Sequence, residues 1–164
     1  MIGGGAWVGD GARIGDGAWV GDGAVIEDGA RIWNGVKIGR GALVGGGVVI
    51  GRGASIGDGT RVGDGAWIGY GVVIGDSVKI MKGATIGKER KNVKNNLVIA
   101  GIGETENITA FTCEDGLIIC IGCMNGHHGL SPEETKKEIA KKYHSNHEYF
   151  KALELAEYWY KRIA

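Results

Sequence analysis

The chain has 164 residues, and its 19 lysines and arginines balance its 19 aspartates and glutamates. A neutral chain without a long block of like charge has no strong field to attract nucleic acid or a membrane surface. Glycine occurs 33 times and proline once, which excludes a collagen-like chain. We expect no secretory signal, because Met1 leads straight into glycines, and no membrane span, because no apolar run approaches about 18 residues. Three closely spaced cysteines, Cys113 to Cys123, argue against a disulfide scaffold and favour a reducing, cytoplasmic location.

A six-residue repeat occupies the first half of the chain. Isoleucine or valine recurs at every sixth position from Ile2 to Ile86, without an insertion. A small or β-branched residue follows four positions later, and glycine stands three positions after the aliphatic residue except at Ser77. The aliphatic and small residues predict inward side chains that stack between layers. The glycine predicts a corner with positive φ, and the aspartate or asparagine that often precedes it suits a tight turn.

Each hexad is therefore expected to form one short strand and one turn, so that three hexads complete a triangular coil of 18 residues. Fifteen hexads would give about five coils, or about 24 Å of prism at the ~4.8 Å spacing of β-strands. The repeat ends after Ile86. We therefore divide the chain into a solenoid at 1–91 and a C-terminal segment at 92–164.

The repeated unit (I/V)-G-x-G-(A/V)-x, as in IGDGAW and IGRGAS, resembles that of the hexapeptide-repeat proteins. The resemblance implies an all-β solenoid, the left-handed parallel β-helix, and usually a homotrimer of acyltransferase-like architecture. The repeat is also close to an idealised consensus, which leaves an engineered origin open.

Outward-facing residues precede each inward aliphatic residue, and the 18-residue period sorts them into three faces. Trp7, Val25 and Leu43 share one face, and adjoining apolar residues on a surface indicate an interface. We expect this column to form the trimer contact; the alternative is that the C-terminal segment packs on the surface tryptophans. The edge at Met1–Val8 has no predicted cap, and an open β-edge favours end-to-end association.

The C-terminal segment predicts a small α+β cap. A capping box with proline at the first helical position occurs at Ser131–Glu134. The predicted elements are a strand at 97–103, a hairpin of strands at 107–113 and 117–123 around the turn at 114–116, a helix from the capping box to about 143, and a second helix from about 147. The second helix carries an apolar stripe of Tyr149, Leu153, Ala156, Tyr160 and Ile163.

The stretch CIGCMNGHHG, residues 120–129, gathers the residue types that bind zinc or act as nucleophiles. If 117–123 is a strand, however, Cys120 and Cys123 point to opposite faces and cannot share a metal unless a bulge intervenes. A nucleophilic pair of Cys123 with His127 or His128 lacks an identifiable third member. We therefore favour buried cysteines in a sheet, followed by a polar loop that leads into a helix.

The C-terminal segment also resembles that of uncharacterised hexapeptide-repeat proteins found in phages and bacteria, over about residues 97–160. The resemblance names no activity, and it singles out Cys123 rather than Cys120. Departures are Met124 for an aromatic residue, Ser145 for glycine, and a longer entry to the helix. The matching residues are Thr109, Ala110, Phe111, Asp115, Gly116, Gly122, Cys123, Gly126, His144, Asn146 and Tyr149.

Enzymes of the hexapeptide-repeat family are mostly acyltransferases that use a histidine as general base, and the γ-type carbonic anhydrases of this fold hold zinc with three histidines. Residues 1–91 contain no histidine, and all four histidines, His127, His128, His144 and His147, lie in the C-terminal segment. We therefore assign no catalytic residue, no metal site and no cofactor.

The preferred prediction is a non-catalytic structural or small-ligand-binding homotrimer, either phage-associated or engineered. The alternatives are an acetyl-CoA-dependent acyltransferase and a zinc-binding protein that uses the cysteines and histidines of the C-terminal segment. A small anionic ligand at the subunit interfaces would find cationic donors in three arginines. The candidate ligand-binding residues are Cys123, Asn125, His127, His128, Arg40, Arg52 and Arg61.

Overall fold

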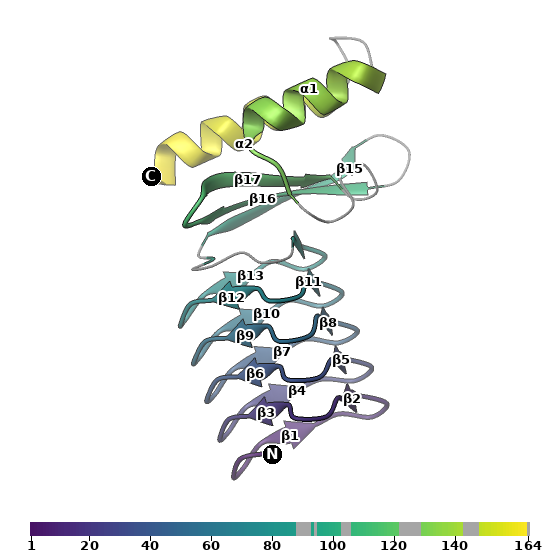
Figure 1. Ribbon diagram of the computed structural model, residues 1–164, viewed down its shortest axis with the longest axis vertical. Coiled ribbons are helices and arrows are strands. Elements are labelled where there is room, and N and C mark those ends of the chain that lie inside the picture. The colour runs from purple at the N-terminus through teal and green to yellow at the C-terminus, as the bar shows by residue number, and fades with distance from the viewer. Residues whose placement is uncertain (88–92, 94, 103–105, 122–128, 143–147, 164) are drawn as a thin grey trace.

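The computed structural model describes residues 1–87, 93, 95–102, 106–121, 129–142 and 148–163. It is a parallel β-solenoid followed by a cap of three antiparallel strands and two helices (Figure 1). The predicted fold class, an all-β solenoid with a small α+β cap, is confirmed. Within the described ranges, no helix is both long enough and apolar enough to cross a membrane.

The solenoid consists of two-residue strands, three to a turn, that form three parallel sheets in the orders β1-β4-β7-β10-β13, β2-β5-β8-β11-β14 and β3-β6-β9-β12. Paired residues are 18 positions apart, as in Trp7 with Val25 and Val25 with Leu43, so the predicted coil length is confirmed. The strands are β1 (Trp7–Val8), β2 (Arg13–Ile14), β3 (Trp19–Val20), β4 (Val25–Ile26), β5 (Arg31–Ile32), β6 (Lys37–Ile38), β7 (Leu43–Val44), β8 (Val49–Ile50), β9 (Ser55–Ile56), β10 (Arg61–Val62), β11 (Trp67–Ile68), β12 (Val73–Ile74), β13 (Lys79–Ile80) and β14 (Thr85–Ile86).

The two ends of the solenoid differ from its middle. At the N-terminal end, Ile2 forms only an isolated bridge with Val20, so the strands fall short of five complete turns. Ile2 is also 54% exposed, as expected for an edge without a cap. At the other end, Val93 pairs in parallel with Ile74, which extends the solenoid pairing past the last strand.

The core is a column of inward aliphatic residues. Each repeat isoleucine or valine from Val20 to Ile86 is at most 2% exposed, and the small residues of the repeat pack beside them. Burial of such a side chain contributes about 1.5–3 kcal/mol, so a thin solenoid needs no large aromatic core. Thr60 occupies one small-residue position, where its Oγ1 donates to the carbonyl of Gly75 (2.7 Å) and accepts from the N–H of Val78 (3.2 Å).

The corner glycines have the predicted backbone conformation. From Gly5 to Gly83, the glycine three positions after each inward aliphatic residue has φ between 62° and 69°. Ser77, which replaces it once, has φ of 58°. Because a Cβ is strained in this region, glycine is favoured wherever the repeat needs this turn.

The corner aspartates do more than favour a local turn. The Oδ1 of Asp28 accepts a hydrogen bond from the N–H of Asp10 (2.8 Å), and that of Asp58 from the N–H of Arg40 (2.7 Å), each in the preceding coil. A Cβ on Gly9 would lie 2.3 Å from Asp28 Oδ1. Glycine directly after an inward aliphatic residue, as at Gly9, therefore leaves room for the corner residue of the next coil, which is often an aspartate; the sequence analysis missed this pairing.

The cap elements lie close to their predicted positions. The capping box is confirmed, because Ser131 N–H donates to Glu134 Oε2 (3.0 Å) and Glu134 N–H to Ser131 Oγ (3.4 Å). The hairpin turn has Gly116 at a φ of 91°. The elements are β15 (Asn96–Ile102), β16 (Glu106–Cys113), β17 (Gly116–Ile121), α1 (Pro132–Lys142) and α2 (Glu148–Ile163).

The sheet of the cap lies between the end of the solenoid and the two helices (Figure 1). Phe111, Ile118 and Cys120 join the solenoid core, whereas alternate residues of β16 and β17 pack against the helices. The N–H of Thr85 donates to Thr109 Oγ1 (2.8 Å), which ties the last coil to β16. The cap therefore closes the C-terminal end of the solenoid.

The two helices form the outer layer of the cap. An ion pair joins Lys136 Nζ to Glu157 Oε1 (2.8 Å), and this hydrogen bond to Glu157 raises the pKa of Lys136. On α2, the first three residues of the predicted stripe, Tyr149, Leu153 and Ala156, are buried, whereas Ile163 is 40% exposed. The stripe therefore packs on the sheet only along the first part of the helix.

Candidate functional site

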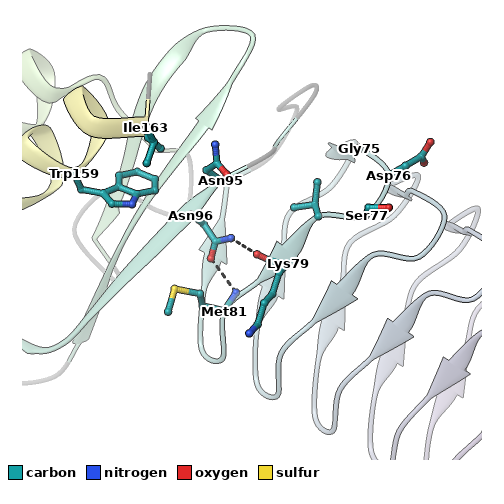
Figure 2. A pocket seen from close by; sticks show the side chains of 10 residues that line it. Gly75, Asp76, Ser77, Lys79, Met81, Asn95, Asn96, Trp159 and Ile163 are labelled. Carbon is teal, nitrogen blue, oxygen red and sulfur yellow. Dashed lines mark hydrogen bonds between the residues drawn. The ribbon is translucent and has the colours of Figure 1, made fainter.

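A cavity of about 680 Å³ lies where the last coil meets the cap (Figure 2), and we call it the junction cavity. One wall is the solenoid corner around Ser77, the opposite wall is the end of α2, and the start of β15 lies between them. The lining residues are Gly75, Asp76, Ser77, Val78, Lys79, Met81, Asn95, Asn96, Trp159 and Ile163.

Asn96 fixes the position of the cap at this cavity. Its Oδ1 accepts a hydrogen bond from the N–H of Met81 (2.9 Å), and its Nδ2 donates to the carbonyl of Lys79 (2.6 Å). These backbone groups flank Ile80 in β13, the outermost strand of its sheet. The side-chain amide of Asn96 therefore occupies the backbone N–H and carbonyl groups with which the strand of a further coil would otherwise form hydrogen bonds.

The junction cavity contains two departures from the repeat. Ser77 is the only non-glycine with positive φ in the described residues, and Met81 replaces the glycine that normally follows an inward aliphatic residue. A non-glycine residue in this backbone region costs about 1–2 kcal/mol, and such strain clusters at functional sites. Both departures are visible in the sequence, so the repeat itself could have indicated this site.

The lining combines polar groups with an indole. Ser77 offers a hydroxyl, Lys79 an ammonium, Asn95 an amide and Asp76 a carboxylate, with Trp159 on the facing helix. These groups can hydrogen-bond a polar molecule while the ring covers its apolar face. In the described parts of the chain, no three histidine, cysteine, aspartate or glutamate side chains lie close enough together to hold a metal ion.

Asn96→Ala should loosen the cap without unfolding the solenoid. The substitution removes both bonds to β13, which together contribute about 1–2 kcal/mol. We expect faster hydrogen exchange at Met81 and across β15, and unchanged exchange in the middle coils. Asn95→Ala is the matched control, because Asn95 bonds to Thr112 through its backbone N–H and carbonyl. Equal exchange at β15 in the two variants would contradict the role of the Asn96 amide.

Two smaller grooves lie on the solenoid near its N-terminal end. One, of about 330 Å³, includes Arg13, Arg31 and Trp33, and the other, of about 400 Å³, includes Trp7 and Glu27. Trp33 and Glu27 each replace the glycine that follows an inward aliphatic residue. The grooves and the junction cavity thus lie where a side chain interrupts the otherwise smooth surface of the repeat.

The C-terminal site predicted from the sequence falls largely outside the described residues. This holds for Cys123, Asn125, His127 and His128, so the zinc and nucleophile alternatives stay predictions. Cys120 is buried in β17, and this strand ends at Ile121, two residues before Cys123. Cys113 is half-buried, with its Sγ 3.8 Å from Asp115 Oδ2.

The three arginines proposed as cationic donors lie on different parts of the solenoid. Arg40 and Arg52 are at corners on different edges of the prism. The backbone carbonyl of Arg40 accepts a hydrogen bond from Gly59 in the next coil, and that of Arg52 accepts one from Gly71. Arg61 is on β10, in the middle of a face. Arg40 also lies 3.8 Å from Asp58 in an exposed ion pair. None of the three lines the junction cavity or either groove.

The predicted trimer contact consists of Trp7, Val25 and Leu43, which lie in register on adjacent strands. Trp7 is 53% exposed, and Val25 and Leu43 beside it are half-buried. The cap lies at the opposite end of the solenoid from β1 (Figure 1). The described part of the C-terminal segment therefore does not pack on Trp7, and the alternative that this segment covers the other surface tryptophans stays a prediction.

Comparisons with known proteins found solved structures that are similar to about half of the chain. No protein-family model matches the sequence, and no curated protein matches it. A hexapeptide transferase family protein from Anaplasma phagocytophilum is 24% identical over 51% of this chain and 55% of its own, with a TM-score of 0.42. The acetyltransferase domain of PglB from Neisseria gonorrhoeae FA1090 is 21% identical over 58% and 51%, with a TM-score of 0.34.

A GDP-perosamine N-acetyl transferase from Caulobacter crescentus is 24% identical over 50% of this chain and 47% of its own, with a TM-score of 0.26. The chain spans about half the length of these proteins, and identities this low concern the fold alone. The hexad repeat and the parallel solenoid are consistent with the hexapeptide-repeat superfamily.

Proposed function

We propose that this protein is a non-catalytic homotrimer, a rigid solenoid that binds a small polar ligand in the junction cavity. The observation that supports the proposed trimer is the column formed by Trp7, Val25 and Leu43. A half-exposed tryptophan beside two half-buried aliphatic residues forms an apolar patch on a flat face, and such patches mark protein interfaces. Tryptophan is also the residue type most enriched among those that dominate binding energy.

The absence of histidine from residues 1–91 supports a non-catalytic role for the solenoid. Acyl transfer to a hydroxyl or amine needs a base that accepts a proton near neutral pH, and histidine serves this purpose best. Acetyl-CoA should therefore leave the melting temperature unchanged. A rise in melting temperature with acetyl-CoA would favour the acyltransferase alternative instead.

The junction cavity supports the ligand-binding part of the proposal. Its volume of about 680 Å³ lies within the usual ~300–1,000 Å³ of small-molecule sites. Ser77 accepts a strained backbone where the repeat elsewhere has glycine, which suggests that its hydroxyl serves a purpose other than folding. A small molecule retained by the purified protein in native mass spectrometry, and lost in Ser77→Gly, would support this assignment. Retention of the same molecule by Ser77→Gly would contradict it.

Trp7→Glu is expected to convert the trimer of 17.2 kDa chains to monomers. A carboxylate in the centre of an apolar contact would remain unpaired on association, which costs several kcal/mol per subunit contact. Sedimentation velocity at several concentrations would measure the change. Trp19→Glu is the matched control, because Trp19 is 39% exposed on a different sheet. A monomeric wild-type protein, or a trimer that survives Trp7→Glu, would contradict the proposal.

A further inference from the structure

We propose that the groove lined by Arg13, Arg31 and Trp33 binds a small planar anion, an aromatic ring that carries a phosphate or carboxylate group. This site is separate from the junction cavity and from the Trp7 column. It lies on the sheet that contains β2 and β5, whereas Trp7 is on the sheet that contains β1 and β4.

The first observation is a pair of like charges in register. Arg13 and Arg31 are direct partners on β2 and β5, with both side chains exposed on the same face. Like charges directly opposite each other in a sheet are destabilising. Within the described residues, neither guanidinium has an ion-pair or hydrogen-bond partner, so none of the carboxylates described there offsets the repulsion. An anion between the two guanidinium groups would remove this cost.

The second observation is the tryptophan beside the arginines. Trp33 stands where twelve of the fifteen repeats have glycine, and it is 57% exposed. The equivalent residue in the preceding coil is Gly15, where a Cβ would lie 2.6 Å from the N–H nitrogen of Asn34. Gly15 and Trp33 both line the groove. The repeat requires neither the tryptophan nor its exposure.

The groove has the size and chemistry of a small-ligand site. Its volume of about 330 Å³ is at the lower end of the usual ~300–1,000 Å³ range. Guanidinium groups bind phosphate or carboxylate through two parallel hydrogen bonds, and an indole face stacks on planar rings. The amide of Asn34 adds a donor and an acceptor at the corner. The arginines and the tryptophan together therefore fit a ligand with both an anionic group and a flat ring.

Calorimetric titration with AMP, adenosine and inorganic phosphate would test the site. We expect AMP to bind at least tenfold more tightly than either adenosine or phosphate, and its affinity to fall as salt is added. Arg31→Gln should weaken AMP binding at least tenfold. Trp33→Gly restores the residue that the repeat normally has, so the variant should fold, and it should reduce AMP binding to the level of phosphate.

Arg61→Gln is the matched control. Arg61 is also in register with a cation, Lys79, on an exposed face, but no tryptophan lies at the adjoining corner. AMP affinity should be unchanged in this variant. Equal losses in Arg61→Gln and Arg31→Gln would reveal non-specific charge attraction and would overturn the proposal. So would AMP binding no tighter than phosphate, or a loss of trimer rather than of AMP binding in Arg31→Gln, since the groove would then be a subunit contact.

Discussion

Ile50→Ala should lower the free energy of unfolding by about 3 kcal/mol. Ile50 is fully buried on β8 in the middle of the solenoid, where it pairs with Ile32 below and Ile68 above. Neighbouring coils close a cavity poorly, because each coil is held in register by hydrogen bonds to the next. The loss would appear as a lower midpoint in urea denaturation followed by circular dichroism.

The matched control is Val49→Ala on the same two-residue strand. Val49 points outward and is only half-buried, so we expect a change below about 1 kcal/mol. Similar losses in the two variants would mean that the inward column does not dominate stability. In a solenoid each repeat contacts only its neighbours, so the Ile50 variant should also open locally. Hydrogen exchange would then rise around β8 and its partners before it rises elsewhere.

Gly45→Ala should lower the free energy of unfolding by about 2–4 kcal/mol although it adds a single methyl group, because Gly45 is buried at a corner of the solenoid. The new Cβ would lie 2.5 Å from Asp64 Oδ1 and 2.8 Å from the Asp64 nitrogen. The clash costs about 1–3 kcal/mol, and displacement of Asp64 also weakens its bond to the N–H of Gly46 (3.2 Å), worth about 1 kcal/mol. Thermal unfolding would measure the effect.

Gly46→Ala is the control for this prediction, because the two glycines are adjacent. A Cβ on Gly46 would meet nothing closer than 3.5 Å, and its φ lies outside the left-handed region. We expect a change of less than about 0.5 kcal/mol there. Glu27 shows how the fold accepts a side chain directly after an inward aliphatic residue, where most repeats have glycine. The residue above it is Gly46, which has no side chain, and Glu27 Oε2 accepts a hydrogen bond from the N–H of Gly46 (3.1 Å). If Gly45→Ala and Gly46→Ala were equally stable, the aspartate of the next coil would not require glycine below it.

The sequence alone could predict the solenoid because every coil repeats the same local requirements. An inward isoleucine every six residues sets the core, and a glycine with positive φ sets each corner. The capping box at Ser131 predicted the start of α1 for the same reason, since its bonds join residues three apart in the chain. Periodicity of this kind needs no knowledge of distant residues.

The candidate sites were harder to predict, because each depends on residues far apart in the sequence. The stretch 120–129 attracted attention through its rare residue types, yet most of its predicted ligands lie outside the described residues. The junction cavity instead joins a corner of the last coil to Trp159 on α2. Ser77, Met81, Trp33 and Glu27 were visible as exceptions to the repeat, and each lines a cavity or groove.

The sequence by itself determined the coil length, the inward column, the corner conformation and the elements of the cap. Each follows from a period or from a motif within a few residues, where local geometry decides the outcome. Only the tertiary structure decided that aspartates bond from one coil to the next and that the cap sheet closes the solenoid with Phe111 in its core. It also decided that Trp33 and the paired Arg13 and Arg31 line one groove. The 18-residue period places residues of successive coils on one face, but the hydrogen bonds and cavities between coils depend on the backbone geometry of the stacked coils, which the period alone does not specify.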